Sequence, residues 1–194
     1  MNKKSFAHKI TKTILERYGE NYYKKMGLAI AEKSPLTQRE KTVLQGTKTD
    51  SGLIVKQHVT FLDFNIDFAY YRNGELIAVE EVLGFKKQKC SLFFDLLVLY
   101  EKFKKLREHY PVPFLVTTWF EEKATGRICR FPMDLAAWCL EKGIVLLFLD
   151  NQKCLDIKAK VLNAKFSEAD FNELKMFIQS QLQDLTRFKK GALS

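Results

Sequence analysis

The chain has 194 residues with 46% hydrophobic and 13% aromatic content, which is enough apolar material for one domain with a sizeable core. Its formal net charge of +9 favours a polyanionic partner, and nucleic acid is the class that we expect. The sequence shows no secretory leader, no apolar run that could cross a bilayer and no zinc-type cysteine pairs, so we expect a cytoplasmic protein with free thiols and no membrane partner.

Positive charge and helical periodicity characterise the N-terminal segment, residues 1–48, which holds eleven Lys/Arg and four Glu. The spacing of its apolar residues predicts helices over Ser5–Tyr23, Tyr22–Lys33 and Thr37–Gln45. Lys9 and Lys12 lie in the first of these helices. Because a basic helix face attracts phosphate groups, we expect these two lysines to contact nucleic acid.

The next segment predicts three β-strands. Residues Leu53–Thr60 alternate between apolar and polar side chains, which is typical of a half-buried strand. The stretch Phe61–Val82 predicts two strands joined at Asn73-Gly74, because both turn residues tolerate the positive φ of a tight hairpin. Asp67 lies deep in the first of these two strands, and Glu80 lies deep in the second.

Helices and strands alternate in the second half of the chain. The predicted elements are, in order, helix Gln88–Tyr110, strand Pro113–Trp119, helix Met133–Lys142, strand Ile144–Leu149 and helix Glu168–Leu185. Strand–helix–strand units need right-handed parallel crossovers. We therefore expect one α/β domain with a central mixed β-sheet flanked by helices on both faces. The α/β core would span 53–150, after the basic helical segment, and a C-terminal helix would span 167–186.

Asp67 and Glu80 are the candidate chemical groups of the chain. A carboxylate among apolar neighbours on an interior strand is costly unless it is paired, hydrogen-bonded or bound to a metal. Two such carboxylates on adjacent strands predict a divalent-cation site. The alternative interpretation of the same residues is a pair of structural carboxylates bridged to lysines.

Two short motifs, Ile66-Asp67 and Ile77-Ala78-Val79-Glu80, resemble those of the PD-(D/E)xK nuclease superfamily of restriction-type endonucleases. The order of the predicted elements from Leu53 to Leu149 resembles the core of that superfamily as well. The resemblance implies a restriction-endonuclease-like sandwich in which Asp67 and Glu80 bind Mg²⁺, or Mn²⁺ as a substitute, with the backbone carbonyl of Glu81 as a further ligand. The ion would lower the pKa of an attacking water and stabilise charge on the scissile phosphate.

One position departs from the superfamily pattern, because Val82 stands where the motif has its lysine. The nearest lysines in the sequence lie at the start of the following predicted helix. We expect Lys89 to supply the missing catalytic cation, and Lys86 and Lys87 to contact nucleic acid.

The register of the second hairpin strand leaves one alternative open. A slip of one residue exchanges the two faces of a strand, so that Glu81 and not Glu80 would face the metal. The motif favours Glu80, because this residue follows directly on the apolar run.

These observations predict a metal-dependent endonuclease that hydrolyses phosphodiester bonds, with DNA favoured over RNA. The resemblance makes a homodimer a candidate assembly, since restriction-type enzymes often dimerise to cut both strands. One alternative is a catalytically degenerate relative that only binds nucleic acid. Another is an RNA endonuclease resembling the viral cap-snatching domains, in which His8 would be a metal ligand.

Overall fold

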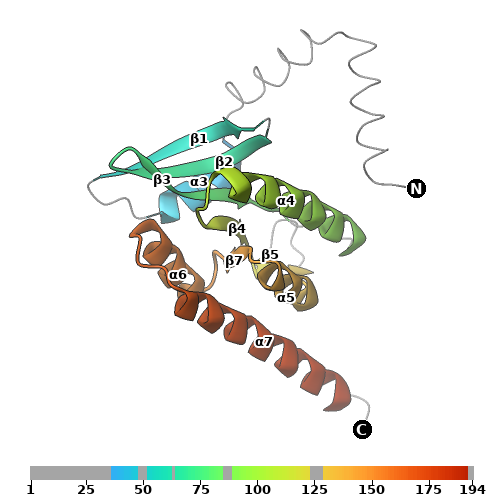
Figure 1. Cartoon of the computed structure of the whole chain (residues 1–194). Coiled ribbons are helices and arrows are strands. Elements are labelled where there is room, and N and C mark those ends of the chain that lie inside the picture. Colours follow the sequence, from blue (N-terminus) through green and yellow to red (C-terminus); the bar gives the residue numbers. More distant parts are fainter. Residues whose placement is uncertain (1–35, 48–51, 63, 85–88, 123–128, 192–194) are drawn as a thin grey trace, which may run out of the picture. The chain divides into compact units, whose positions relative to one another are not determined.

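The computed structural model describes residues 36–47, 52–62, 64–84, 89–122 and 129–191 (Figure 1). Backbone contacts divide the chain into two units, Met1–Leu36 and Thr37–Ser194, and all the elements below belong to the second unit. The helices predicted before Thr37 lie outside the described residues. The same holds for six of the side chains singled out in the sequence, which are those of His8, Lys9, Lys12, Lys86, Lys87 and Lys89.

A five-stranded mixed sheet forms the centre of the second unit, with the strand order β1-β2-β3-β4-β7 (Figure 1). Its strands are β1 (Leu53–Phe61), β2 (Phe64–Arg72), β3 (Glu75–Val82), β4 (Phe114–Thr118) and β7 (Val145–Phe148). The pairs β1–β2 and β2–β3 are antiparallel, whereas β3–β4 and β4–β7 are parallel. The predicted α/β fold with a mixed sheet is therefore confirmed. A separate ribbon pairs β5 (Glu121–Glu122) with β6 (Cys129–Arg130).

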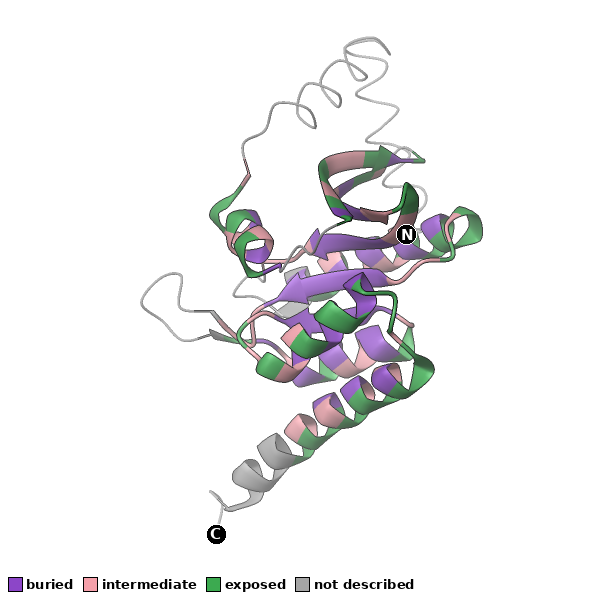
Figure 2. Cartoon of the chain, turned by 90° about the vertical axis from the view of Figure 1, so that its left-hand side faces the viewer, coloured by how far each residue is buried: buried purple, intermediate pink, exposed green. Residues whose placement is uncertain are grey.

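The described part of the chain forms five helices in addition to this sheet. They are α3 (Gln38–Gly46), α4 (Lys89–His109), α5 (Met133–Glu141), α6 (Gln152–Leu162) and α7 (Glu168–Gly191). Helix α4 covers one face, where Phe103 contacts Phe114 of β4 with ring centroids 5.6 Å apart. Helix α6 covers the opposite face through Lys158, which reaches Glu80 of β3. Strands β4 and β7 are buried along their whole length and hold the centre of the core (Figure 2).

Helix α4 ends close to its predicted boundary. Its last residue is His109, because Pro111 disfavours helical backbone in the residue before it. The apolar stretch of this helix is interrupted by Asp95. Within the described residues, no helix combines the length and the apolar character that crossing a bilayer requires.

The hairpin between β2 and β3 forms at the predicted turn. Asn73 and Gly74 both have positive φ, 52° and 82°, as a tight two-residue turn requires. Arg72 and Glu75 pair directly across this turn. The prediction of the hairpin and of its turn residues is confirmed.

A bulge interrupts this hairpin beyond the turn. Tyr71 pairs with Leu76, but the next pair is Tyr70 with Ala78, so one extra residue, Ile77, is accommodated in β3. The bulge shifts every later pair of the two strands by one residue. A shift of one residue changes which side chains of β3 share a face with those of β2.

Helix α6 was not among the predicted elements, and the sequence left residues 150–166 without an assignment. The helix begins after Asn151, whose side chain accepts a hydrogen bond from the backbone N–H of Cys154. Cys154, Ile157 and Val161 form its buried face at helical spacing. An N-cap residue followed by this spacing is the signal that identifies the helix in the sequence.

Candidate metal centre

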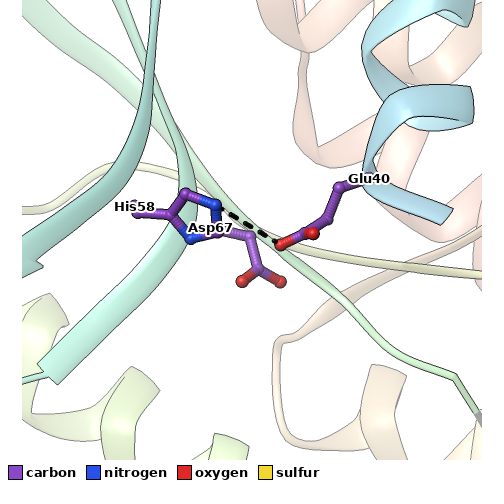
Figure 3. A group of neighbouring side chains, drawn as sticks. All are labelled: Glu40, His58 and Asp67. Atoms are coloured by element: carbon purple, nitrogen blue, oxygen red, sulfur yellow. Dashed lines mark ion pairs between the residues drawn. The ribbon is translucent and has the colours of Figure 1, made fainter. Parts of the chain in front are cut away.

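Side chains from one helix and two strands meet beside β2. Glu40 of α3, His58 of β1 and Asp67 of β2 each offer one ligand atom, and these atoms all lie within 4.8 Å of one another (Figure 3). Carboxylate oxygens suit Mg²⁺ and Mn²⁺, and an imidazole nitrogen adds affinity for transition ions. The three residues are therefore a candidate donor set for a divalent cation.

Glu40 is held in place by the start of its own helix. The hydroxyl of Thr37 accepts a hydrogen bond from the backbone N–H of Glu40, and the Glu40 carboxylate accepts one from the backbone N–H of Thr37. This reciprocal arrangement is a capping box, which satisfies two backbone donors at the helix N-terminus. Because one carboxylate oxygen is fixed in the box, the other is directed towards His58, whose Nε2 lies 3.9 Å away.

His58 interrupts the regular backbone of β1. Its φ is 48°, in the left-handed region that non-glycine residues rarely adopt, although the β1–β2 register on either side places it opposite Asp67. Its Nε2 atom is buried and has no hydrogen-bond partner within the described part of the chain. A buried imidazole nitrogen without a partner is unusual, and such a nitrogen is available as a ligand.

Glu81 of β3 lies beside Asp67, next to this donor set. A regular two-residue hairpin would place Glu80 opposite Asp67, but the bulge pairs Glu80 with Phe68 and brings Glu81 beside Asp67. The carboxyl groups of Asp67 and Glu81 are close enough for each to shift the pKa of the other. We call Glu40, His58, Asp67 and Glu81 the acidic cluster.

Burial raises the pKa of both carboxyl groups, and a neighbouring charge adds to the rise in each, that of Glu40 for Asp67 and that of Asp67 for Glu81. For Asp67, burial is the main cause, and a hydrogen bond of 2.7 Å from the backbone N–H of Val82 acts in the opposite direction. Burial, and then the charge of Asp67, raise the pKa of Glu81 to about 8. Near neutral pH this rise favours a proton on the carboxyl group of Glu81. A divalent cation would take the place of that proton and allow both groups to ionise.

A lysine of α4 is in direct contact with this pair. The Nζ atom of Lys102 lies 2.7 Å from Glu81 Oε1 and donates a second hydrogen bond of 3.1 Å to the backbone carbonyl of Asn65. The charge of Lys102 lowers the pKa of Glu81, against the stronger effect of burial. The ammonium group thus faces both the acidic cluster and the β2 strand that carries Asp67.

Glu80, which the sequence pairs with Asp67, lies on the opposite face of the sheet. Its carboxylate is fully buried and accepts hydrogen bonds from the hydroxyls of Tyr70 and Thr117. Lys158 of α6 lies 2.9 Å from both of its oxygens. These partners satisfy Glu80 completely, so the structure does not bring it to Asp67. Glu80 thus matches the alternative interpretation, in which the carboxylate is structural and is bridged to a lysine.

The structure does not test the roles predicted for the three lysines at the start of the helix. Lys89 begins α4, but its side chain lies outside the described residues, as do Lys86 and Lys87. Lys102 is the lysine that α4 presents to the cluster. The signal for it in the sequence is its spacing, three residues after Leu99 and four before Leu106, because both leucines are buried against the sheet.

A pocket of about 590 Å³ adjoins the acidic cluster. The pocket is lined by Thr37, Gln38, Arg39, Glu40, Asp67, Val82 and Gly84. The first turn of α3 forms one wall, and the end of β3 forms the other. Both Asp67 and Glu40 thus border a space that can admit a ligand.

No protein-family model, no curated protein and no solved structure matches this chain.

Proposed function

We propose that this chain is a metal-dependent endonuclease that hydrolyses phosphodiester bonds in nucleic acid, with DNA favoured over RNA. The observation that carries the proposal is the pair of adjacent carboxyl groups, Asp67 and Glu81, with Lys102 bonded to Glu81. The same grouping supports a restriction-endonuclease-like arrangement of the α/β fold, with Glu81 in the role that the sequence suggested for Glu80.

The residues of the acidic cluster fit Mg²⁺ or Mn²⁺. Glu40, His58 and Asp67 bring their ligand atoms within 4.8 Å of one another, and Glu81 offers a further hard carboxylate beside Asp67 from the neighbouring strand. When bound, such an ion would lower the pKa of a water molecule and stabilise charge on the scissile phosphate. The backbone N–H of Val82 donates to one carboxylate oxygen of Asp67 and so restricts the orientation of this ligand.

Lys102 supplies the positive charge that Val82 cannot provide at the motif position. A lysine ammonium has three N–H donors. Lys102 uses one for Glu81 and one for the Asn65 carbonyl, which leaves a third for the attacking water or a phosphate oxygen. Because the two bonds fix the ammonium before substrate binds, its charge is preorganised for the transition state.

The histidine in the cluster favours a second candidate function, an RNA endonuclease. The sequence suggested a histidine ligand only for the case of a cap-snatching type of enzyme, and assigned it to His8. His58 offers a buried imidazole nitrogen at the cluster instead. An imidazole ligand would also favour Mn²⁺ over Mg²⁺.

The test is a cleavage assay on plasmid DNA, single-stranded DNA and RNA, with Mg²⁺, with Mn²⁺ and with a chelator. We expect cleavage that needs the ion and that Asp67→Asn or Glu81→Gln abolishes. Glu75→Gln is the matched control, because Glu75 is an exposed carboxylate on the same strand as Glu81.

Cleavage that survives both the chelator and Asp67→Asn would rule out the proposal. Binding of nucleic acid without cleavage of any substrate would favour the binding-only alternative. Faster cleavage of RNA than of DNA would select the second candidate.

A further inference from the structure

Arg39 holds an unusual position at the edge of the pocket beside the acidic cluster. It directly precedes Glu40 in the first turn of α3, and both residues line the pocket together with Asp67. The central carbon of its guanidinium group lies 6.0 Å from the centre of the Trp119 ring. A cation over an aromatic face is held electrostatically, and Arg is the side chain most often found in this arrangement. The planar charge of Arg39 is thus fixed next to the site.

Gly84 is the second residue that fixes Arg39. A Cβ atom added at Gly84 would overlap with Nη1 and Cζ of Arg39, so the guanidinium would have to leave this position if the residue carried a side chain. Gly84 is not one of the described glycines with positive φ, which are Gly52, Gly74 and Gly143. Its backbone therefore does not need glycine. The missing side chain serves the close approach of Arg39 to the end of β3.

The chemistry of a guanidinium group suggests the ligand of this position. Five N–H donors in a rigid plane match the oxygens of a phosphate group in pairs, and the charge is permanent at all physiological pH values. A metal-loaded acidic cluster would hold one phosphate of a nucleic-acid strand, and Arg39 lines the same pocket. A neighbouring phosphate of that strand is then the group that falls within reach of Arg39.

We propose that Arg39, held between Trp119 and Gly84, is a phosphate-binding residue that contacts the backbone of the nucleic-acid strand next to the scissile phosphate. This inference rests on the proposed endonuclease function and adds to it a substrate contact. A contact to the phosphate backbone carries no sequence information. Arg39 therefore contributes affinity and strand position for every sequence alike.

The experiment measures binding of a short fluorescein-labelled DNA strand and of its duplex by fluorescence anisotropy. Ca²⁺ replaces Mg²⁺ to keep the DNA uncut, and the salt concentration is varied. We expect Arg39→Ala to weaken binding by roughly 10- to 100-fold, whatever the sequence, because a hydrogen-bonded charge is lost. The slope of log K against log salt should fall by about 0.9 for a duplex, since one phosphate contact is removed. Lys41→Ala is the matched control, because Lys41 is exposed on the same helix and does not line the pocket.

Gly84→Ala tests the geometry behind the proposal. In the natural chain it should weaken DNA binding nearly as much as Arg39→Ala, because the new methyl group displaces the guanidinium. In the Arg39→Ala background it should have no further effect, since no guanidinium is left to displace. Thermal unfolding of each variant separates this effect from a loss of fold.

Titration with Mn²⁺ in the absence of DNA separates this inference from the proposed function. Arg39→Ala should bind Mn²⁺ as the natural chain does, whereas Asp67→Asn should not. If Arg39→Ala leaves the DNA affinity and the salt slope unchanged, the inference is overturned. If the natural chain still cleaves nucleic acid in that case, the endonuclease function stands. An equal loss from Gly84→Ala in both backgrounds, or no DNA binding by the natural chain, would overturn it as well. If the natural chain cuts no substrate but Arg39→Ala loses DNA binding, the phosphate contact is supported and the endonuclease function is rejected.

Discussion

Lys158 and Glu80 form a buried ion pair in which the lysine Nζ lies 2.9 Å from both carboxylate oxygens. The exposed fractions of the two side chains are 5% and 0%, so water cannot stabilise either charge alone. Tyr70 and Thr117 donate to the same carboxylate, which satisfies its remaining acceptor sites. The pair joins α6 to β3 across the face of the sheet that lies away from the acidic cluster.

We expect Lys158→Met to lower the free energy of unfolding by about 3–5 kcal/mol, because Glu80 then becomes an uncompensated buried charge. Urea denaturation followed by circular dichroism measures this loss. Adding Glu80→Gln to the same variant should recover part of the loss, since it removes that charge. Lys153→Met is the control: its pair with Glu173 is exposed, and we expect a loss of at most about 1 kcal/mol. An equally small loss in Lys158→Met would contradict the structural role of the pair.

Elements that depend on local chemistry could be predicted from the sequence. Asn73 and Gly74 define their turn through their own backbone preferences, and Pro111 ends α4 through its own ring. The spacing of buried leucines located α4 itself. None of these features requires knowledge of a distant part of the chain.

The faces of the hairpin strands could not be predicted in the same way. A regular hairpin after Asn73-Gly74 places Glu80 opposite Asp67, and this is the arrangement that the motif favours. The bulge at Ile77 moves Glu81 into that place instead. A bulge forms where the packing on both faces of the sheet favours it, and no single residue in the sequence indicates its position. The partner that fixes Glu80 on the other face, Lys158, lies on α6, which the sequence left unassigned.

The pKa of Glu81 predicts a pH-dependent metal affinity. Burial and the neighbouring Asp67 raise this pKa to about 8, so below that pH an ion must displace a proton from the carboxyl pair. The affinity for Mn²⁺ should therefore rise with pH up to about 8 and level off above it. Calorimetric titrations in buffers of different ionisation enthalpy measure both the affinity and the protons released.

The stability of the metal-free protein should change in the opposite direction. A raised pKa means that the folded chain holds the proton more tightly than the unfolded chain does, so stability falls as pH rises from the ordinary pKa of 4.5 towards about 8. Glu81→Gln should remove this slope and also the proton release on metal binding. Proton release that persists in Glu81→Gln would assign it to another group.

Lys102 should act mainly in the transition state. Lys102→Met keeps the length of the side chain but removes the ammonium that contacts Glu81 and the Asn65 carbonyl. We expect kcat to fall by roughly 100-fold or more, with a much smaller change in KM. The same variant should raise the pKa of Glu81 further, and the pH profile of cleavage should move to higher pH.

Lys104→Met is the control for this prediction, because Lys104 is an exposed lysine on the same helix that contacts the Tyr100 ring and not the cluster. Its effect should be confined to a small weakening of substrate binding. An equal fall of kcat in the two variants would show that α4 contributes only a general positive charge.

Because the backbone of His58 is left-handed, its cost in stability can be measured separately from its role as a metal ligand. At φ 48° a side chain with a Cβ atom is strained, and glycine is not. We expect His58→Gly to be more stable to urea than His58→Ala by about 1 kcal/mol, the reverse of the usual order within a strand. Both variants lose the imidazole, so both should lose affinity for Mn²⁺ to the same extent and affinity for Mg²⁺ to a lesser one.

Gln57 has no such backbone, and Gln57→Gly should be less stable than Gln57→Ala by about 0.5–1 kcal/mol. If His58 followed the order of Gln57, its backbone would be regular. If Mn²⁺ affinity survived in both His58 variants, the imidazole would have no part in the acidic cluster as a metal site.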